Sequence, residues 1–247
     1  MLLNTVVVLS SALAVSASNE WRAPTETDLR SPCPMVNAVA NHGYLPRDGL
    51  NISLADLIVA FTDAVNLDPA ATTLVGQKAL TTGNNVTFDL DMLNQPGGKT
   101  FTLKYTRRKL NIAVIEHDGS LSRNDFYLGD NHSFNQTIWN SVASHFNQST
   151  ISIETAAAAR KARLQAAAAA NPHFSLPAAG AQFSFIETAL YLSVFGSVQD
   201  GNAVTEWVKV LFEQERLPFR EGFTRSETVI TAAGILGLVS KVVAASS

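Results

Sequence analysis

The sequence predicts an all-α protein, a single-domain bundle of about eight to ten helices with at most a small hairpin. Apolar residues recur at helical spacing along most of the 247-residue chain. Hydrophobic residues make up 46% of the sequence and charged residues 16%, so the chain has enough apolar surface for a large core. The sequence contains no internal repeat and no interdomain linker, which favours one extended domain.

The N-terminal segment resembles a secretory signal peptide. Residues 2–17 are apolar and end in small residues, so we expect a signal peptide over residues 1–17 and a folded domain over residues 18–247. No lysine or arginine precedes this stretch, and the alternative is a buried or membrane-bound helix, although the stretch is short for a bilayer span. Asn-x-Ser/Thr glycosylation sequons also indicate secretion, and they lie at Asn51, Asn85, Asn131, Asn135 and Asn147.

Helix-start signals define the first half of the domain. Pro34 suits the first position of a short helix, because its φ is fixed and no amide hydrogen is missed there. Ser53 caps a helix that runs to about Asn66, and Pro69 starts one that runs to about Thr82.

The remaining segments follow in chain order. Residues 83–110 are rich in turn residues, with a turn at Asn94–Gly98 and at most a short strand or hairpin, and Leu110–Ile115 is extended or buried. The expected later helices are a short one capped by Ser122 with Asp125 in its first turn, then Asn135–Phe146, 152–170, 178–195, Val204–Arg216 and Ser226–Ala245.

Charge and hydropathy narrow the classes of partner. The formal net charge is −3 and the chain has no dense basic run, so we expect no nucleic-acid partner. In the alanine-rich segment, Arg160, Lys161 and Arg163 indicate a solvated or partner-binding face. The apolar segment 228–243 contains Lys241 and small polar residues, which favours a packed core helix and no transmembrane anchor.

Cys33 is the only cysteine and lies between Pro32 and Pro34. One thiol cannot form an internal disulfide, so it is inert, paired with another molecule or used chemically. A helix that starts at Pro34 would present unpaired amides and a dipole that stabilise a thiolate at Cys33. The alternative is that Cys33 is a small buried apolar side chain.

Glu187 lies in the middle of the apolar segment 178–195, where a carboxylate is costly unless it is paired or functional. Phe183, Leu190 and Tyr191 share its helical face, so apolar walls are expected around the acid. A salt bridge along the helix is the alternative. No lysine or arginine lies within the segment, which favours burial beside a cofactor or a histidine.

The run Glu116–Ser120 contains two carboxylates, an imidazole and a hydroxyl. Its oxygen atoms suit a hard cation, and equally Asp118 could orient His117 for acid–base chemistry. A solvated loop is the alternative to both. A zinc site is excluded because no second histidine or cysteine lies at ligand spacing.

Together these elements resemble the secreted fungal heme-thiolate peroxidases, the chloroperoxidase and unspecific peroxygenase family. The likeness extends from about residue 20 to residue 225, and the chain length and the histidine of the second motif suggest the short group of peroxygenases. The matching motifs are Pro32-Cys33-Pro34 with Asn37, Ala40-Asn41-His42-Gly43-Tyr44 and Pro46-Arg47; Glu116-His117-Asp118 with Ser120-Leu121-Ser122-Arg123 and Asp125; Gly129-Asp130-Asn131 with Phe134-Asn135; Phe183 with Glu187; and Glu215-Arg216-Leu217-Pro218 with Glu221-Gly222.

The resemblance implies a bundle that encloses heme b, with Cys33 as the axial thiolate ligand of the iron. It implies that Glu187 is the distal acid–base catalyst and is paired with His117, while Asp118 helps to hold the imidazole.

The resemblance also implies a magnesium ion, or alternatively manganese, near a heme propionate. Its ligands would be Glu116, the backbone carbonyl of His117, and Ser120. The substrate pocket is expected to be lined by Phe183, Leu190, Tyr191 and Ile115.

The implied activity is that of a secreted, extracellular peroxygenase. It would use hydrogen peroxide to oxygenate C–H or C=C bonds of small apolar or aromatic substrates, with peroxidase side activity. The alternatives are a halogenating chloroperoxidase or an oxidase of secondary metabolism and, from another class, a non-catalytic secreted helical binding protein. Some family members have further cysteines that form disulfides, and this chain has none, so we expect no disulfide-linked dimer.

Overall fold

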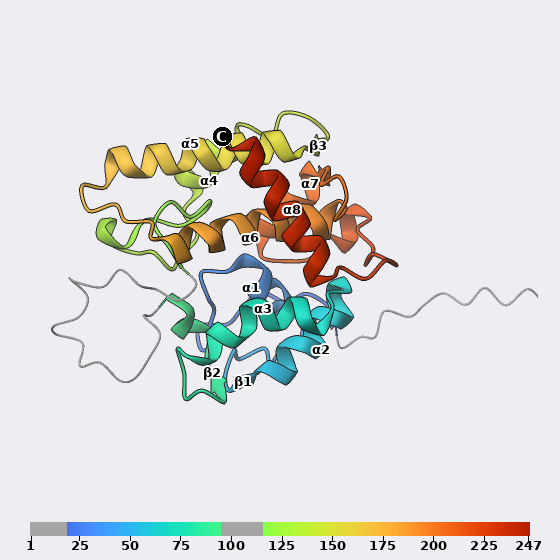
Figure 1. Ribbon diagram of the computed structural model, residues 1–247. Helices are drawn as coiled ribbons and strands as arrows, with labels where there is room; N and C mark the ends of the chain where they lie inside the picture. The colour runs from blue at the N-terminus through green and yellow to red at the C-terminus, as the bar shows by residue number, and fades with distance from the viewer. Residues whose placement is uncertain (1–18, 95–115) are drawn as a thin grey trace, which may run out of the picture.

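The fold is described by a computed structural model for residues 19–94 and 116–247 (Figure 1). Within these ranges the chain forms eight α-helices and four two-residue strands, which confirms the all-α prediction. The α-helices are α1 (Pro34–Asn41), α2 (Leu54–Val65), α3 (Pro69–Leu80), α4 (Gln136–Ala143), α5 (Ile153–Ala170), α6 (Ala178–Phe195), α7 (Thr205–Gln214) and α8 (Ala232–Ala245). Short 3-10 helices are η2 (Leu90–Asn94), η3 (Phe126–Leu128) and η4 (Phe219–Glu221), and the strands are β1 (Ile52–Ser53), β2 (Thr87–Phe88), β3 (Thr150–Ile151) and β4 (Ala203–Val204).

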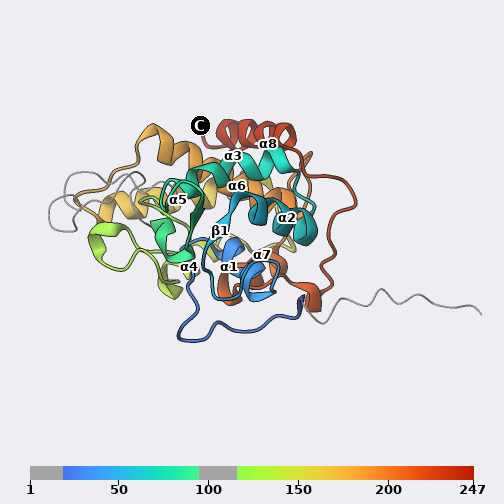
Figure 2. The same cartoon turned by 90° about the horizontal axis from the view of Figure 1, so that it is seen from below.

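Helix α6 runs through the middle of the bundle (Figure 1). It packs against α8, α5 and α7, and its last residues, Tyr191–Phe195, are all buried. Figure 2 shows α3 and α8 on one side of α6, and α1 and α7 on the other. An apolar surface on every side of a helix requires such a central place, because each face must be covered.

The helix starts in the first half match their capping signals. Pro34 is the first residue of α1. The hydroxyl of Ser53 accepts a hydrogen bond from the amide of Asp56, and the carboxylate of Asp56 accepts one from the amide of Ser53, which forms a capping box at α2. Helix α2 ends at Asn66, whose left-handed φ of 59° is one that asparagine tolerates.

The strands connect segments that are distant in sequence. Strand β1 pairs antiparallel with β2, with Ile52 opposite Phe88, and β3 pairs with β4, with Thr150 opposite Val204. These sheets are therefore long-range contacts, and their small size agrees with the expectation of at most a small hairpin. Residues 95–98 of the expected turn, the segment 110–115 and the expected signal peptide 1–17 lie outside the described residues.

The helix expected at Ser122 does not form. The hydroxyl of Ser122 accepts a hydrogen bond from Nη1 of Arg123 at 2.7 Å and therefore does not cap a helix. The first helical turn in this region is η3, which follows Asp125. The buried guanidinium of Arg123 thus uses the hydroxyl that the prediction assigned to the cap.

The last helix also starts later than predicted. The segment before α8 runs extended, because Ile230 forms a parallel bridge with Leu67 and exchanges main-chain hydrogen bonds with Asn66 and Asp68. Thr231 then caps α8 by accepting from the amide of residue 234. Helix α8 packs on α6 and α5, as expected for a core helix, and among the described residues no helix has the length and apolarity that a membrane crossing needs.

His42, directly after α1, connects the start of the described chain to the segment that follows α7. Its Nε2 accepts a hydrogen bond from the amide of Leu217 at 3.1 Å, so Nδ1 carries the proton and donates to the main-chain oxygen of Asn19 at 2.8 Å. Burial lowers the pKa of His42 below its ordinary value of 6.5. A proton on Nε2 would remove the acceptor that Leu217 needs.

We expect the free energy of unfolding to decrease as the pH falls below about 6.5, because the unfolded chain then binds a proton that the folded His42 resists. Urea denaturation between about pH 8 and about pH 5 measures this. His42→Gln retains a side-chain acceptor without titrating, so its unfolding free energy should depend less on pH than that of the wild type. An equal decrease in both proteins would contradict this role of His42.

Candidate active site

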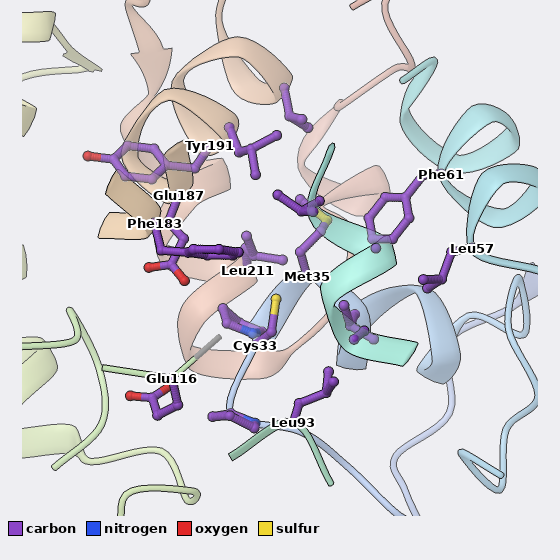
Figure 3. Close-up of a pocket in the computed structure, with 18 of the residues that line it drawn as sticks. Cys33, Met35, Leu57, Phe61, Leu93, Glu116, Phe183, Glu187, Tyr191 and Leu211 are labelled. Carbon is purple, nitrogen blue, oxygen red and sulfur yellow. The ribbon is translucent and has the colours of Figure 1, made fainter. Parts of the chain in front are cut away.

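A cavity of about 170 Å³, measured as the space open to the centre of a water-sized sphere, lies between two groups of helices. Helices α2 and α3 line one side and α6 and α7 the other, while the start of α1 and the loop after Glu116 complete the wall. Most lining side chains are aliphatic or aromatic. Figure 3 shows Cys33, Glu116 and Glu187 around the same space. Three motifs that are far apart in the sequence therefore meet at one cavity.

Cys33 is the residue that precedes the first turn of α1. Its backbone is extended, with φ −82° and ψ 112°, and its sulfur points into the cavity (Figure 3). Burial raises the pKa of the Cys33 thiol to about 11, against the amides of Val36 and Met35, which lower it. The amides at the helix start act in the expected direction, and desolvation of the sulfur opposes them. A cation bound at the sulfur would reverse this balance.

Glu187 faces the cavity from the middle of α6 and meets His117 on the opposite loop. The distance between Glu187 Oε2 and His117 Nε2 is 3.2 Å. The expected pairing of the acid with a histidine is therefore present. The expected burial is not complete, because the Glu187 side chain is 42% exposed whereas that of His117 is 7% exposed.

Both ring nitrogens of His117 face acceptors. Nε2 lies beside the carboxylate of Glu187, and Nδ1 lies 2.8 Å from the main-chain oxygen of Asp118. Only the protonated imidazolium can donate to both. Burial by itself would lower the pKa of His117, but the hydrogen bond and charge of Glu187, with the charge of Glu116, raise it to about 9.

Asp118 holds the imidazole differently from the prediction. The contact comes from its main-chain carbonyl. Its buried carboxylate accepts hydrogen bonds from the amide of Ser175 at 3.0 Å and from the side chain of Asn171 at 3.3 Å. Asp118 thus fastens the His117 loop to the segment that joins α5 to α6.

Glu116, in the same loop, is buried and faces the cavity. Burial raises its pKa to about 8, while the charge of His117 and a hydrogen bond from Ser120 lower it. Its Oε1 has no hydrogen-bond partner. Gly119 turns the loop with a φ of 77°, and a Cβ there would collide with Leu164. In the described part of the chain, no three histidine, cysteine, aspartate or glutamate side chains are grouped as metal ligands.

The interpretation of the alanine-rich helix α5 as a solvated basic face is wrong for two of its three cations. Arg160 is buried, with its guanidinium 3.5 Å from the ring centroid of Phe185. Arg163 is also buried and donates to the main-chain oxygen of Ser120 at 2.8 Å. Only Lys161 is exposed. The sequence did contain a sign of this burial. The spacing of Arg160 and Arg163 places both on one face of α5, among small alanines that allow close packing.

The expected substrate-pocket residues Phe183, Leu190 and Tyr191 line the cavity, and Ile115 lies outside the described residues. The ring of Tyr191 lies along the wall with its hydroxyl directed away from Cys33 (Figure 3). The sequence analysis did not identify the opposite wall. That wall comes from α2 and α3, and its residues include Leu57, Phe61, Val65, Thr72, Val75, Gly76 and Ala79.

Comparison with known proteins identifies the chain as a peroxide-dependent oxidoreductase. The chain belongs to the family described as Peroxidase, family 2, whose model matches residues 19–228, and the resemblance to fungal heme-thiolate peroxidases is confirmed. The alternative of a non-catalytic helical binding protein is therefore wrong.

Curated relatives agree with this family. The chain is 30% identical over 220 residues to an aromatic peroxygenase of Coprinellus radians, a match that covers 83% of each chain. It is 28% identical over 234 residues to an aromatic peroxygenase of Cyclocybe aegerita, which covers 89% of this chain and 62% of that relative. It is 33% identical over 115 residues to a chloroperoxidase of Leptoxyphium fumago, which covers 43% of this chain and 26% of that relative.

We expect Asp118→Asn to lower the free energy of unfolding by about 1–3 kcal/mol, because a neutral amide oxygen accepts these bonds more weakly than the buried carboxylate does. Urea denaturation measures this loss. Asp130→Asn is the matched control, since the exposed Asp130 also accepts two bonds, from the amides of His132 and Ser133, and water can replace them. A larger loss for Asp130→Asn would contradict this interpretation.

Proposed function

We propose that the protein is a secreted peroxygenase that uses hydrogen peroxide to oxygenate C–H or C=C bonds of small apolar or aromatic substrates, with peroxidase side activity. The observation that carries the proposal is that the thiol of Cys33 and the carboxylate of Glu187 line one apolar cavity. The relative that matches 83% of this chain is named an aromatic peroxygenase. The match to the chloroperoxidase covers 43%, so halogenation, or oxidation in secondary metabolism, is the second choice.

The residues around the cavity fit a heme. The apolar walls of α2, α3, α6 and α7 suit the faces of a macrocycle, and the sulfur of Cys33, which points into the space, would hold its iron. A thiolate-bound heme supplies the oxidising chemistry, since the electron-rich sulfur favours cleavage of the peroxide O–O bond. The protein supplies orientation and the transfer of protons.

Glu187 is the group that moves the proton. Its carboxylate accepts a proton from one oxygen of hydrogen peroxide and returns it to the other oxygen, which leaves as water. His117 donates to Glu187 Oε2 and fixes the orientation of this carboxylate, while the main-chain oxygen of Asp118 fixes the ring. The 42% exposure of the Glu187 side chain on the cavity side supports this role, because a fully enclosed acid could not reach peroxide.

The apolar lining supports the proposed substrate class. Phe183 and Leu190 stand on the same face of α6 as Glu187, and Leu57 and Phe61 face them from α2. Such a wall favours apolar and aromatic molecules, because it offers them burial without unsatisfied polar groups. It also excludes water from the region where the substrate is oxidised.

A magnesium or manganese ion near a heme propionate remains part of the proposal. Its ligands would be the carboxylate of Glu116, the backbone carbonyl of His117, and Ser120. Oxygen donors of this kind suit a hard cation. The supporting observation is the buried Oε1 of Glu116, which has no hydrogen-bond partner and would gain one in such an ion.

Secretion also remains a proposal, supported by the apolar segment 1–17 and by the sequons. Asn51, Asn85 and Asn147 are exposed and accessible to a glycan. The other two are less suitable, because Asn131 is buried and the side chain of Asn135 caps α4 by accepting from the amide of residue 138.

We expect the purified protein to contain heme, and its reduced carbon monoxide complex to show the red-shifted Soret band of thiolate ligation. Cys33→Ala should lose this band because the only thiol is removed. Glu187→Gln, which leaves the sulfur in place, should retain it. A colourless protein from heme-sufficient cells, or an unchanged band in Cys33→Ala, would end the proposal.

We expect Glu187→Gln to slow peroxide activation by roughly 10²–10⁴-fold, because an amide cannot carry the proton between the peroxide oxygens. Stopped-flow spectroscopy of the holoenzyme with peroxide measures this rate. Glu206→Gln, which removes an exposed carboxylate on α7, is the control and should react like the wild type. A wild-type rate in Glu187→Gln would exclude Glu187 as the proton carrier.

A further inference from the structure

The turn that carries Cys33 is closed by the side chain of Asn37. Asn37 Oδ1 accepts from the amide of Ser31 at 2.7 Å, and Asn37 Nδ2 donates to the carbonyl of Ser31 at 2.7 Å. The hydroxyl of Ser31 in turn accepts from the amide of Cys33 at 3.0 Å. Both Ser31 and Asn37 are 1% exposed. One amide side chain in α1 thus determines the path of the chain through Ser31 to Cys33.

Asn37 is itself oriented by Glu215, which lies 178 positions further along the chain. Glu215 Oε1 accepts the second proton of Asn37 Nδ2 at 2.9 Å, and the same oxygen accepts from Arg123 Nη2 at 2.7 Å. The Arg123 side chain is 1% exposed. The carboxylate therefore lies between a buried cation and the amide that holds the cysteine turn.

The backbone of Glu215 is held in an unfavourable conformation. It ends α7 with a left-handed φ of 46° and ψ of 51°, a conformation that is unfavourable for a residue with a β-carbon. Its carbonyl oxygen accepts from Asn41 Nδ2 at 3.0 Å and from Trp21 Nε1 at 3.3 Å. These bonds fix the residue where its carboxylate meets Asn37 and Arg123, so the end of α7 is joined to α1 by both main chain and side chain.

The ion pair also extends to the opposite part of the cavity. Arg123 Nη1 donates to the hydroxyl of Ser122 at 2.7 Å, and Ser122 lines the cavity close in sequence to Glu116 and Ser120. Arg123 therefore joins the loop of the distal acid–base pair to the turn that carries Cys33.

We infer that Glu215 is a positioning residue for Cys33, acting through Asn37. Its ion pair with Arg123 fixes the carboxylate, the carboxylate orients the Asn37 amide, and the amide fixes the Ser31–Cys33 turn and hence the direction of the sulfur. The inference rests on the proposed function, because it takes Cys33 as the axial ligand of heme. Groups that orient a metal ligand tune the electronic properties of the metal, so a displaced sulfur should alter the heme spectrum and its reduction potential.

The chain offers a matched control in the same segment. Arg216 and Glu221 form an ion pair with an N–O distance of 2.6 Å, and the exposed fractions of the glutamates are similar, 21% for Glu215 and 18% for Glu221. Both carboxylate oxygens of Glu221 accept hydrogen bonds from Arg216, and neither has a bond to the cysteine turn among the described residues. Glu221→Gln therefore breaks an equivalent ion pair without touching Asn37.

The experiment compares Glu215→Gln and Glu221→Gln as holoenzymes. Three quantities are measured: the Soret band of the reduced carbon monoxide complex, the heme reduction potential and the melting temperature. Both variants should melt at lower temperature, and only Glu215→Gln should shift the band and the potential. Glu215→Asp keeps the charge and suits a left-handed backbone. Its band and reduction potential should therefore lie between those of the wild type and those of Glu215→Gln. A Glu215→Gln protein whose band and potential equal those of Glu221→Gln would overturn the inference.

A double-mutant cycle with Asn37→Ala tests the route through Asn37. If Glu215 acts through this amide, the shifts of Asn37→Ala and Glu215→Gln are not additive in the double variant. Additive shifts would contradict the route. If Glu215→Gln does not accumulate as holoenzyme, Asn37→Ala alone decides, because a wild-type band and potential there would overturn the inference.

The same measurements separate this inference from the proposed function. A wild-type protein without a thiolate-type band would end the proposed function itself. A wild-type protein with that band, and a Glu215→Gln variant whose band and potential do not change, would end only the role of Glu215.

Discussion

The carboxylate of Glu215 meets the guanidinium of Arg123 at 2.7 Å inside a bundle whose core is otherwise mainly apolar. Removing either partner would leave a desolvated charge, so such a pair is maintained only if the surrounding chain supplies further hydrogen bonds. Here Asn37 in α1 donates to the carboxylate of Glu215. The guanidinium of Arg123 donates to the hydroxyl of Ser122 and to the main-chain oxygen of His132. The helix that starts at the cysteine, the loop of the acid–base pair and the end of α7 are consequently held together by polar contacts. Apolar packing of α6 against α5, α7 and α8 supplies the bulk of the core, and the polar contacts determine how the two sides of the cavity face each other.

The titratable groups at the cavity respond to burial according to the partners that each one has. Desolvation raises the pKa of Cys33 to about 11 and that of Glu116 to about 8, because the nearby amides, cations and hydroxyl compensate only in part. Burial acts in the opposite direction on His117, yet its pKa rises to about 9 because Glu187 provides both a hydrogen bond and a charge. The cavity therefore disfavours uncompensated anions and maintains one ion pair. In the proposed function, the positive charge of a metal bound by Cys33 would offset the cost of a thiolate in this environment.

Local patterns were sufficient to predict much of this architecture. The starts of α1, α2 and α3 follow from Pro34, Ser53 and Pro69, and the central place of α6 follows from its apolar surface on all sides. The meeting of Cys33, His117 and Glu187 was inferred from family motifs, because spacing within one segment carries no information on contacts across segments. The same limit explains the errors. Ser122 bonds to Arg123 instead of capping a helix, Ile230 pairs with Leu67 and delays α8, and Arg160 and Arg163 find buried partners on other elements. Ile230, Arg160 and Arg163 meet partners that are distant in sequence, and so does the Asp118 carboxylate. Arg123 is adjacent to Ser122, but its guanidinium is held by Glu215, 92 positions further along the chain.

The order in which the cavity walls occur along the chain has a consequence for biosynthesis. Cys33, α2 and α3 leave the ribosome early, whereas the covering helices α6 and α7 and the carboxylate of Glu215 are made more than a hundred residues later. If the chain is translated into an oxidising compartment, as the proposed secretion implies, the thiol is until then without its cover and open to mixed disulfides or sulfenic acid. Rapid docking of the C-terminal half would shorten this vulnerable interval, and a slow codon stretch or a delayed chaperone release before α7 would lengthen it.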